Sequence, residues 1–113
     1  MLVTVVETSA YLSKAERIMP EEEMSKVVEM IAAHPEKGDV IKGSGGLRKM
    51  RIGLEGKGKR GGARVIYWFY NAGYPVVLLW VFAKNEASDL TKQQLALLAK
   101  AATGLLQDFR SRP

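Results

Sequence analysis

Apolar and polar residues repeat with a helical period in the first third of this chain. Residues 2–7, rich in β-branched side chains, predict a short strand. Residues 9–19 and 20–34 then carry apolar positions every three or four residues, which predicts two amphipathic helices. Pro20 suits the first turn of the second helix, and Pro35 should end it, because a residue before proline disfavours the helical region.

The middle of the chain shows the shorter period of strands. From residue 48 to residue 54 apolar and polar positions alternate, so that Lys49 and Arg51 share the face opposite the apolar one. Residues 63–70 and 76–84 are continuous apolar runs rich in aromatic side chains. Such runs predict central strands that are covered on both faces.

The last segment, residues 91–110, predicts a helix with one apolar stripe, and Thr91 and Gln94 have the spacing of a capping box. A glycine-rich loop at residues 38–47 precedes the strands. The order β-α-α-β-β-β-α predicts an α+β fold, an antiparallel meander joined by the first strand and packed against helices. The length of 113 residues suits a single compact domain over residues 1–113.

The charges are segregated along the sequence. Residues 1–36 carry three Lys or Arg and seven acids, whereas residues 37–64 carry nine Lys or Arg and two acids. The whole chain has a formal net charge of +5. A basic block inside a folded domain favours an organised anionic partner such as a nucleic acid over a merely soluble basic surface.

Composition narrows the chemistry. The chain has no cysteine and one histidine, His34, which lies where the second helix should end and is expected to be structural. We therefore expect no metal site and no cofactor. No apolar run approaches the roughly 20 residues of a membrane span, and no signal peptide is visible. The expected setting is the cytoplasm, without a membrane partner.

Residues 53–62, "GLEGKGKRGG", match parts of two phosphate-binding patterns, G-x-G-x-x-G and the G-x-x-x-x-G-K of P-loops. Both patterns require a helix after the glycines, but a strand follows here, and Arg60 stands where a P-loop needs Ser or Thr. The alternatives are a solvated hairpin and a loop that contacts RNA phosphates. The basic residues around it favour RNA contact, because six of them can converge on one surface: Lys49, Arg51, Lys57, Lys59, Arg60 and Arg64.

Two stretches, "GDVIKGSGGLRKMRIGLEGKGKRGGARVIYWFY" and "FAKNEASDLTKQQ", resemble the RelE/HigB-type toxins of bacterial type II toxin–antitoxin systems, in particular the HigB-like branch of the RelE/ParE superfamily. The resemblance implies a RelE/ParE-type fold and a metal-independent endoribonuclease that cuts messenger RNA in the ribosomal A site. It also implies three partners: a helix-turn-helix antitoxin protein, the 70S ribosome with its RNA, and messenger RNA.

The resemblance implies roles for individual residues. By position, the expected catalytic residues are Arg64, Lys84, Arg51 and Lys49. The residues expected to bind RNA or the ribosome are Lys57, Lys59, Arg60 and Arg48. This chain has Asn85 and Thr91 where the best-known branch has an arginine and a catalytic tyrosine, so the base used there is not available in the same form.

Cleavage of RNA without a metal needs a deprotonated 2′-hydroxyl, stabilisation of the phosphorane and a proton for the leaving 5′-oxygen. Arginine stabilises phosphate charge, and clustered cations can depress a lysine pKa enough for proton transfer. Glu86 is a possible acid or base. Two alternatives stay open: a ParE-like inhibitor of DNA gyrase, and a nucleic-acid-binding domain that cuts nothing.

Overall fold

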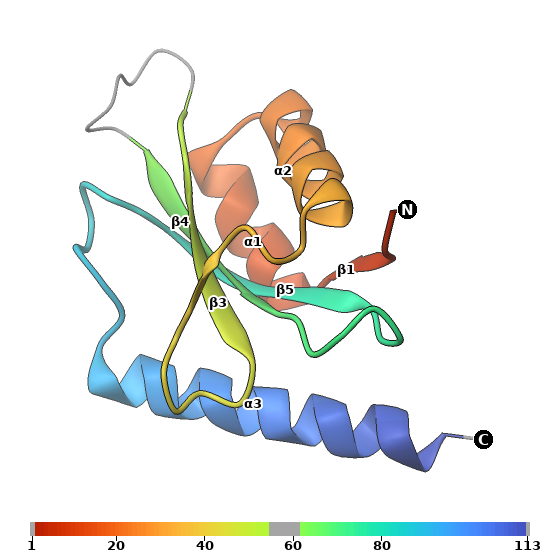
Figure 1. Ribbon diagram of the computed structural model, residues 1–113. Coiled ribbons are helices and arrows are strands. Elements are labelled where there is room, and N and C mark those ends of the chain that lie inside the picture. Colours follow the sequence, from red (N-terminus) through yellow and green to blue (C-terminus); the bar gives the residue numbers. More distant parts are fainter. Residues whose placement is uncertain (1, 55–61, 113) are drawn as a thin grey trace.

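The computed structural model describes residues 2–54 and 62–112, and its elements follow the predicted order with one short strand added (Figure 1). In chain order they are β1 (Val5–Glu7), α1 (Ser9–Ile18), α2 (Glu21–Ala33), β2 (Asp39–Val40), β3 (Leu47–Ile52), β4 (Ala63–Trp68), β5 (Val76–Ala83) and α3 (Lys92–Ser111).

The strands form one sheet in the order β1-β5-β4-β3-β2. Strands β3, β4 and β5 make the predicted antiparallel meander, and β1 joins it by pairing parallel to β5. We predicted loop throughout residues 38–47, but Asp39 and Val40 pair with Lys49 and Arg48 as the edge strand β2. Two residues are too few for an alternating pattern, so this pairing left no signal in the sequence.

The helices cover both faces of the sheet, with α1 and α2 on one side and α3 on the other (Figure 1). Successive residues of β4 therefore enter different cores. Val65 and Tyr67 pack with α1 and α2, whereas Ile66 and Trp68 pack on the side of α3, and all four are fully buried. The prediction that β4 and β5 are covered on both faces is confirmed.

Helix ends follow the predicted capping chemistry. Thr91 and Gln94 form the capping box, with the Thr91 Oγ1 accepting from the Gln94 backbone N–H at 3.0 Å. Helix α2 starts directly after Pro20 and ends before Pro35, close to the predicted limits. The apolar stripe of α3 packs on the sheet as predicted, and no helix in residues 2–54 or 62–112 is long and apolar enough to cross a membrane.

Tyr67 fastens the segment after α2 to the sheet. Its hydroxyl accepts a hydrogen bond of 2.8 Å from the Gly38 backbone N–H and donates one of 2.8 Å to the Pro35 carbonyl. A Cβ at position 38 would lie 2.6 Å from the hydroxyl oxygen, so the close approach requires glycine. The same segment carries the Glu36 and Gly38 carbonyls, which accept hydrogen bonds from Arg48.

Candidate nucleic-acid interface

Three cations lie on one face of β3 and β4, and we call Lys49, Arg51 and Arg64 the basic strip. In the antiparallel register Arg51 lies directly opposite Arg64, and Lys49 lies opposite Ile66. Directly opposed residues share a face, as do alternate residues along a strand. Because Ile66 packs on the side of α3, the strip belongs to that side, and three of the four expected catalytic residues come together.

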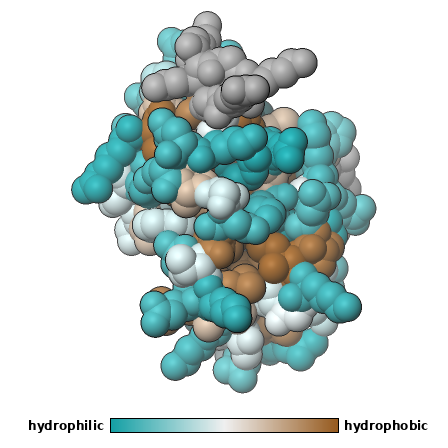
Figure 2. Space-filling view, turned by 90° about the vertical axis from the view of Figure 1, so that its left-hand side faces the viewer, coloured by the Kyte–Doolittle hydropathy of each residue, from teal (hydrophilic) through white to brown (hydrophobic). Residues whose placement is uncertain are grey.

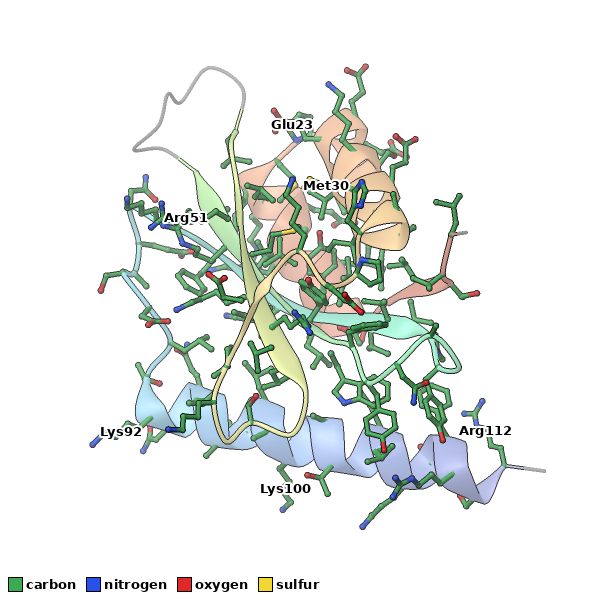
Figure 3. The ribbon with its side chains drawn as sticks, viewed as in Figure 1. Glu23, Met30, Arg51, Lys92, Lys100 and Arg112 are labelled. Atoms are coloured by element: carbon green, nitrogen blue, oxygen red, sulfur yellow. The ribbon has the colours of Figure 1, made fainter. Side chains whose placement is uncertain are left out.

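The strip reaches the surface beside the connection between β5 and α3. Figure 3 shows Arg51 near this connection, and Arg51 also lines a pocket with Lys26 and Met30 of α2. Arg51 is exposed, whereas Lys49 and Arg64 are half-buried. In Figure 2, which views the molecule from the left of Figure 1, hydrophilic residues cover much of this side, with an apolar area lower down. The strip is thus open to a large ligand.

Two arginines that face each other across a ladder repel one another. Opposite residues on one face have Cβ atoms about 4.5–5.5 Å apart, and like charges at that spacing destabilise a sheet. A phosphate between Arg51 and Arg64 would turn this repulsion into attraction on both sides, because a guanidinium fork binds two phosphate oxygens at once. The Arg64 Nη1 also donates to the Ala63 carbonyl at 3.2 Å, which helps to orient its guanidinium.

One carboxylate, Asp89, adjoins the strip. The Lys49 Nζ lies 3.1 Å from each of its two carboxylate oxygens. A hydrogen bond from the Leu90 backbone N–H is the main cause that lowers the Asp89 pKa below its ordinary value, and Lys49 and Arg64 lower it further. Asp89 is therefore a carboxylate at neutral pH and the counter-ion of the strip. The four charged groups keep an excess of positive charge.

The backbone of Lys84 lies beside the end of the basic strip. Its N–H donates to the Gly62 carbonyl at 2.9 Å, which extends the pairing of β5 with β4 by one residue beyond Ala83. The Lys84 side chain is exposed, and among the described residues it has no hydrogen bond or ion pair that fixes its ammonium. Its expected catalytic role remains a prediction.

Arg48 points to the other face of β3. Its Nη1 donates to the carbonyls of Glu36 at 2.9 Å and Gly38 at 2.8 Å, and its guanidinium lies 5.8 Å from the centre of the Phe69 ring. These contacts give Arg48 a structural role on the side of α2, away from the basic strip. RNA binding by Arg48, expected from the sequence, receives no support from this position.

Glu86 is held by groups outside the strip. Its carboxylate lies 2.8 Å from the Lys14 Nζ on α1 and accepts from the Ala83 backbone N–H at 2.7 Å. The hydrogen bond from Lys14, followed by that from Ala83, lowers the Glu86 pKa. These contacts fasten the turn after β5 to α1 and hold the carboxylate apart from Arg51 and Arg64. The possible role of Glu86 as an acid or base stays a prediction.

Comparison with known proteins identifies the family of this chain. Residues 7–111 match the family described as the RelE toxin of the RelE/RelB toxin–antitoxin system. The chain belongs to the RelE toxin family. It is also similar to the solved structure of the E. coli toxin RelE, a double arginine-to-alanine mutant in the free state. The TM-score is 0.56 at 13% identity, over 78% of this chain and 90% of that chain.

Family membership confirms the resemblance to RelE-type toxins and makes this RelE-family protein the toxin of a toxin–antitoxin pair. The structural likeness, at its low identity, concerns the fold and confirms the predicted α+β domain. Placement in the HigB-like branch stays a prediction. The expected RNA contacts of Lys57, Lys59 and Arg60 lie outside the described residues.

Asp89 is the residue of this RelE-family site that sequence reasoning missed. The cations of residues 37–64 are apparent in the sequence, whereas the acid that neutralises them lies outside this segment. The available signal was weak: Asp89 closely precedes the Thr91 cap and follows β5, so it had to lie near the end of the sheet. In the part of the chain that the structure describes, no group of three acidic or histidine side chains could hold a metal ion.

Proposed function

We propose that this RelE-family toxin is a ribosome-dependent, metal-independent endoribonuclease that cuts messenger RNA in the ribosomal A site. The observation that carries the proposal is the opposed pair Arg51 and Arg64, with Lys49 and Asp89 beside it. Attack of a 2′-hydroxyl on the scissile phosphate builds up negative charge on the phosphorane. Two fixed guanidinium groups supply the positive charge that a metal ion supplies in other nucleases.

Arg64 has the geometry for the main phosphate contact. It lies in β4, a central strand whose next four residues are all fully buried, so the core fixes its backbone. A group that stabilises a transition state must be preorganised, because reorientation during the reaction would cost part of the benefit. Arg51 lies in β3 and is more exposed, which suits contact with the same phosphate from the solvent side.

Asp89 and Lys49 are our candidates for proton transfer. Asp89 is ionised and adjoins the strip, so it can accept the proton of the 2′-hydroxyl. Lys49 can donate a proton to the leaving 5′-oxygen while the arginines hold the phosphate. An Asp with a lowered pKa is a weak base, which fits an enzyme whose substrate must be held in line by the ribosome.

The ribosome and the antitoxin complete the proposal. The exposed, open position of the strip admits an RNA strand that is held by a larger particle, and the basic block of residues 37–64 supplies the attraction to ribosomal RNA. We propose a cognate antitoxin of the helix-turn-helix type and action in the cytoplasm, where translating ribosomes are found. Lys84 would contact the RNA beside the strip.

Translation in a purified system tests the proposal. Ribosomes carrying a defined message with a chosen codon in the A site would be mixed with the toxin, and the cut ends would be mapped by primer extension. We expect cleavage within the A-site codon and little cleavage of the same RNA without ribosomes. Arg112→Ala, at the exposed end of α3 and far from Arg51 in Figure 3, is the matched control for Arg51→Ala and Arg64→Ala.

Three results would overturn the proposal. Equal cleavage of naked and translated RNA would remove the dependence on the ribosome. Intact messages together with trapped gyrase–DNA complexes would favour a ParE-like activity, and intact messages with RNA binding alone would favour a non-catalytic domain. Cleaved RNA, gyrase–DNA complexes and bound intact RNA are measured separately, so a nuclease, a gyrase inhibitor and a non-catalytic domain are distinguishable.

A further inference from the structure

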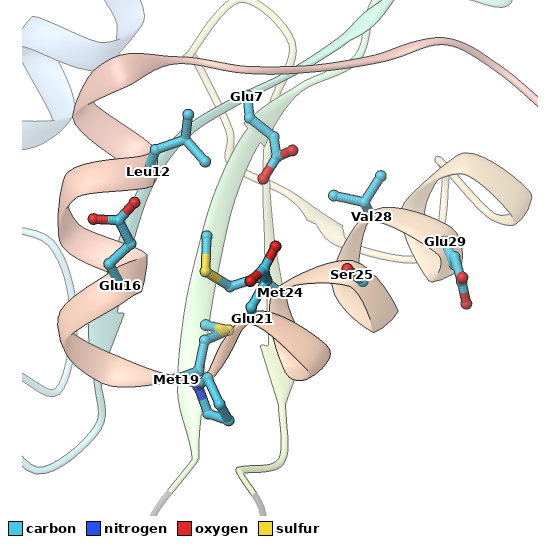
Figure 4. A pocket seen from close by; sticks show the side chains of 10 residues that line it. Glu7, Leu12, Glu16, Met19, Glu21, Met24, Ser25, Val28 and Glu29 are labelled. Atoms are coloured by element: carbon cyan, nitrogen blue, oxygen red, sulfur yellow. The ribbon is translucent and has the colours of Figure 1, made fainter.

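A groove of about 660 Å³ lies between α1 and α2, on the face of the sheet opposite the basic strip (Figure 4). Its volume falls within the range of about 300–1,000 Å³ that is typical of ligand pockets. It is built by three elements, because α1, α2 and the end of β1 all contribute lining residues. Met19 and Pro20, in the turn between the two helices, complete the lining.

The inner lining is apolar. Figure 4 shows Leu12 on α1 and Met24 on α2 directed into the space between the helices, with Met19 at the corner where the helices meet. Val28 continues this surface along α2. Methionine side chains are flexible and polarizable, and they adapt to different apolar side chains of a partner.

The edges of the groove are acidic. Four glutamates line it, Glu7, Glu16, Glu21 and Glu29, and no Lys or Arg does so. None of the four forms an ion pair with a described residue. The groove thus combines an apolar lining with four negative charges that the described residues do not neutralise.

Tyr11 of α1 lies in the core close to Glu7. Its hydroxyl is buried without a hydrogen-bond partner among the described residues. Burial is the main cause that raises the pKa of Tyr11 to about 12, and the negative charge of Glu7 adds to it. Glu7 therefore lies close enough to Tyr11 for its charge to act on this core side chain.

We propose that the groove between α1 and α2 binds a cationic, amphipathic helical segment of a partner protein. Its apolar side chains would fill the space over Leu12 and Met24, and its Lys or Arg residues would pair with the glutamates at the edges. This is the recognition mode in which an amphipathic helix lies in an apolar groove. Carboxylates repel phosphates, so the occupant of this groove is a protein, not RNA.

The two faces of the toxin would then bind partners of opposite charge at the same time. The basic strip on the side of α3 suits RNA, and the acidic groove on the side of α1 and α2 suits a basic protein segment. The inference is independent of the proposed function, because binding in the groove is measured without RNA cleavage.

A direct binding experiment tests the proposal. The probe is a fluorescent Leu/Lys peptide that forms an amphipathic helix of about four turns, titrated with the full chain and followed by anisotropy. A Leu/Glu peptide with the same apolar pattern is the control. The groove variant combines Glu7→Gln, Glu16→Gln and Glu21→Gln. Its matched control makes the same change of net charge on exposed acids outside the groove: Glu22→Gln, Glu36→Gln and Asp108→Asn.

We expect the Leu/Lys peptide to bind and the Leu/Glu peptide to bind far more weakly. The groove variant should lose about tenfold in affinity, since each exposed ion pair contributes a factor of a few, and the control variant should lose less than about twofold. In methyl NMR spectra, the signals of Met19 and Met24 should shift on binding. Val28→Thr, which keeps the side-chain shape, should also weaken binding.

Three outcomes would overturn the proposal. The groove variant and its control could lose the same affinity, which would mean that net charge alone attracts the peptide. The NMR shifts could lie on the side of α3. The chain could form a dimer in sedimentation experiments that the groove variant abolishes and the control variant keeps. In that case a second copy of the chain would occupy the groove. Thermal melts of all variants provide the folding control.

Discussion

Replacement of Arg64 by alanine should abolish most of the proposed cleavage while leaving the fold intact. Arg64 lies opposite Arg51, and in the proposed site both would contact the phosphate, so the variant keeps one of two guanidinium groups. Loss of a single preorganised donor to a developing oxyanion costs about 10²–10³ in rate, or about 2.7–4 kcal/mol of transition-state stabilisation. Arg64→Lys should recover little, because an ammonium cannot form the two parallel hydrogen bonds of a guanidinium.

The effect of Arg64→Ala on stability should be small for reasons visible in the sheet. Removing the guanidinium relieves the repulsion from Arg51, which is directly opposite, and this gain is about 0.2–1 kcal/mol. It also removes an attraction to the exposed carboxylate of Asp89 and the contact of the side-chain stem with the sheet. These terms are of similar size and opposite sign, so the melting temperature should change by only a few degrees.

Single-turnover cleavage at saturating ribosome concentration measures the prediction, with binding to ribosomes and thermal melts recorded for the same samples. We expect near wild-type melting and binding, together with a rate at least about 100-fold lower. Arg112→Ala should match the wild type in all three. A rate close to wild type for Arg64→Ala would refute the reasoning and shift the catalytic centre toward Lys84 and Asp89.

Three further predictions concern charge and burial. Asp89→Asn should lower the melting temperature by a constant, small amount above about pH 4. That deficit should vanish as pH falls through the lowered pKa of the folded state, because the ordinary pKa is 3.8. Tyr11→Phe should be neutral or stabilise by up to about 1 kcal/mol, since the buried hydroxyl has no hydrogen-bond partner among the described residues. The wild type should lose stability between pH 10, the ordinary value, and pH 12, the raised one, and the variant should lose less in an alkaline melt. Replacing Lys57, Lys59 and Arg60 with alanine should weaken ribosome binding and flatten its salt dependence by about one counterion per lost contact. An unchanged salt dependence would mean that these residues belong to a solvated hairpin that does not contact RNA.

The order of elements and the two-sided core were determined by the sequence alone. Helical and strand periods differ, so the burial pattern of α1, α2 and β3 is set by which positions are apolar. The capping box at Thr91 is equally local, because its hydrogen bonds join residues three apart. The position of Arg48 was also readable. It precedes Met50 and Ile52 by two and four residues, so it shares their face on the α2 side and not the face of the strip.

The pairing of the charges was decided only by the tertiary structure. Asp89 meets Lys49 across 40 residues of sequence, and Glu86 meets Lys14 across 72. Arg51 faces Arg64 because of the register that β3 adopts with β4. A local pattern specifies which face of an element is buried. It does not specify register or the reach of a long side chain, which depend on the packing of segments far apart in the chain. That packing brings Asp89 to Lys49 of the basic strip and Glu86 to Lys14 of α1.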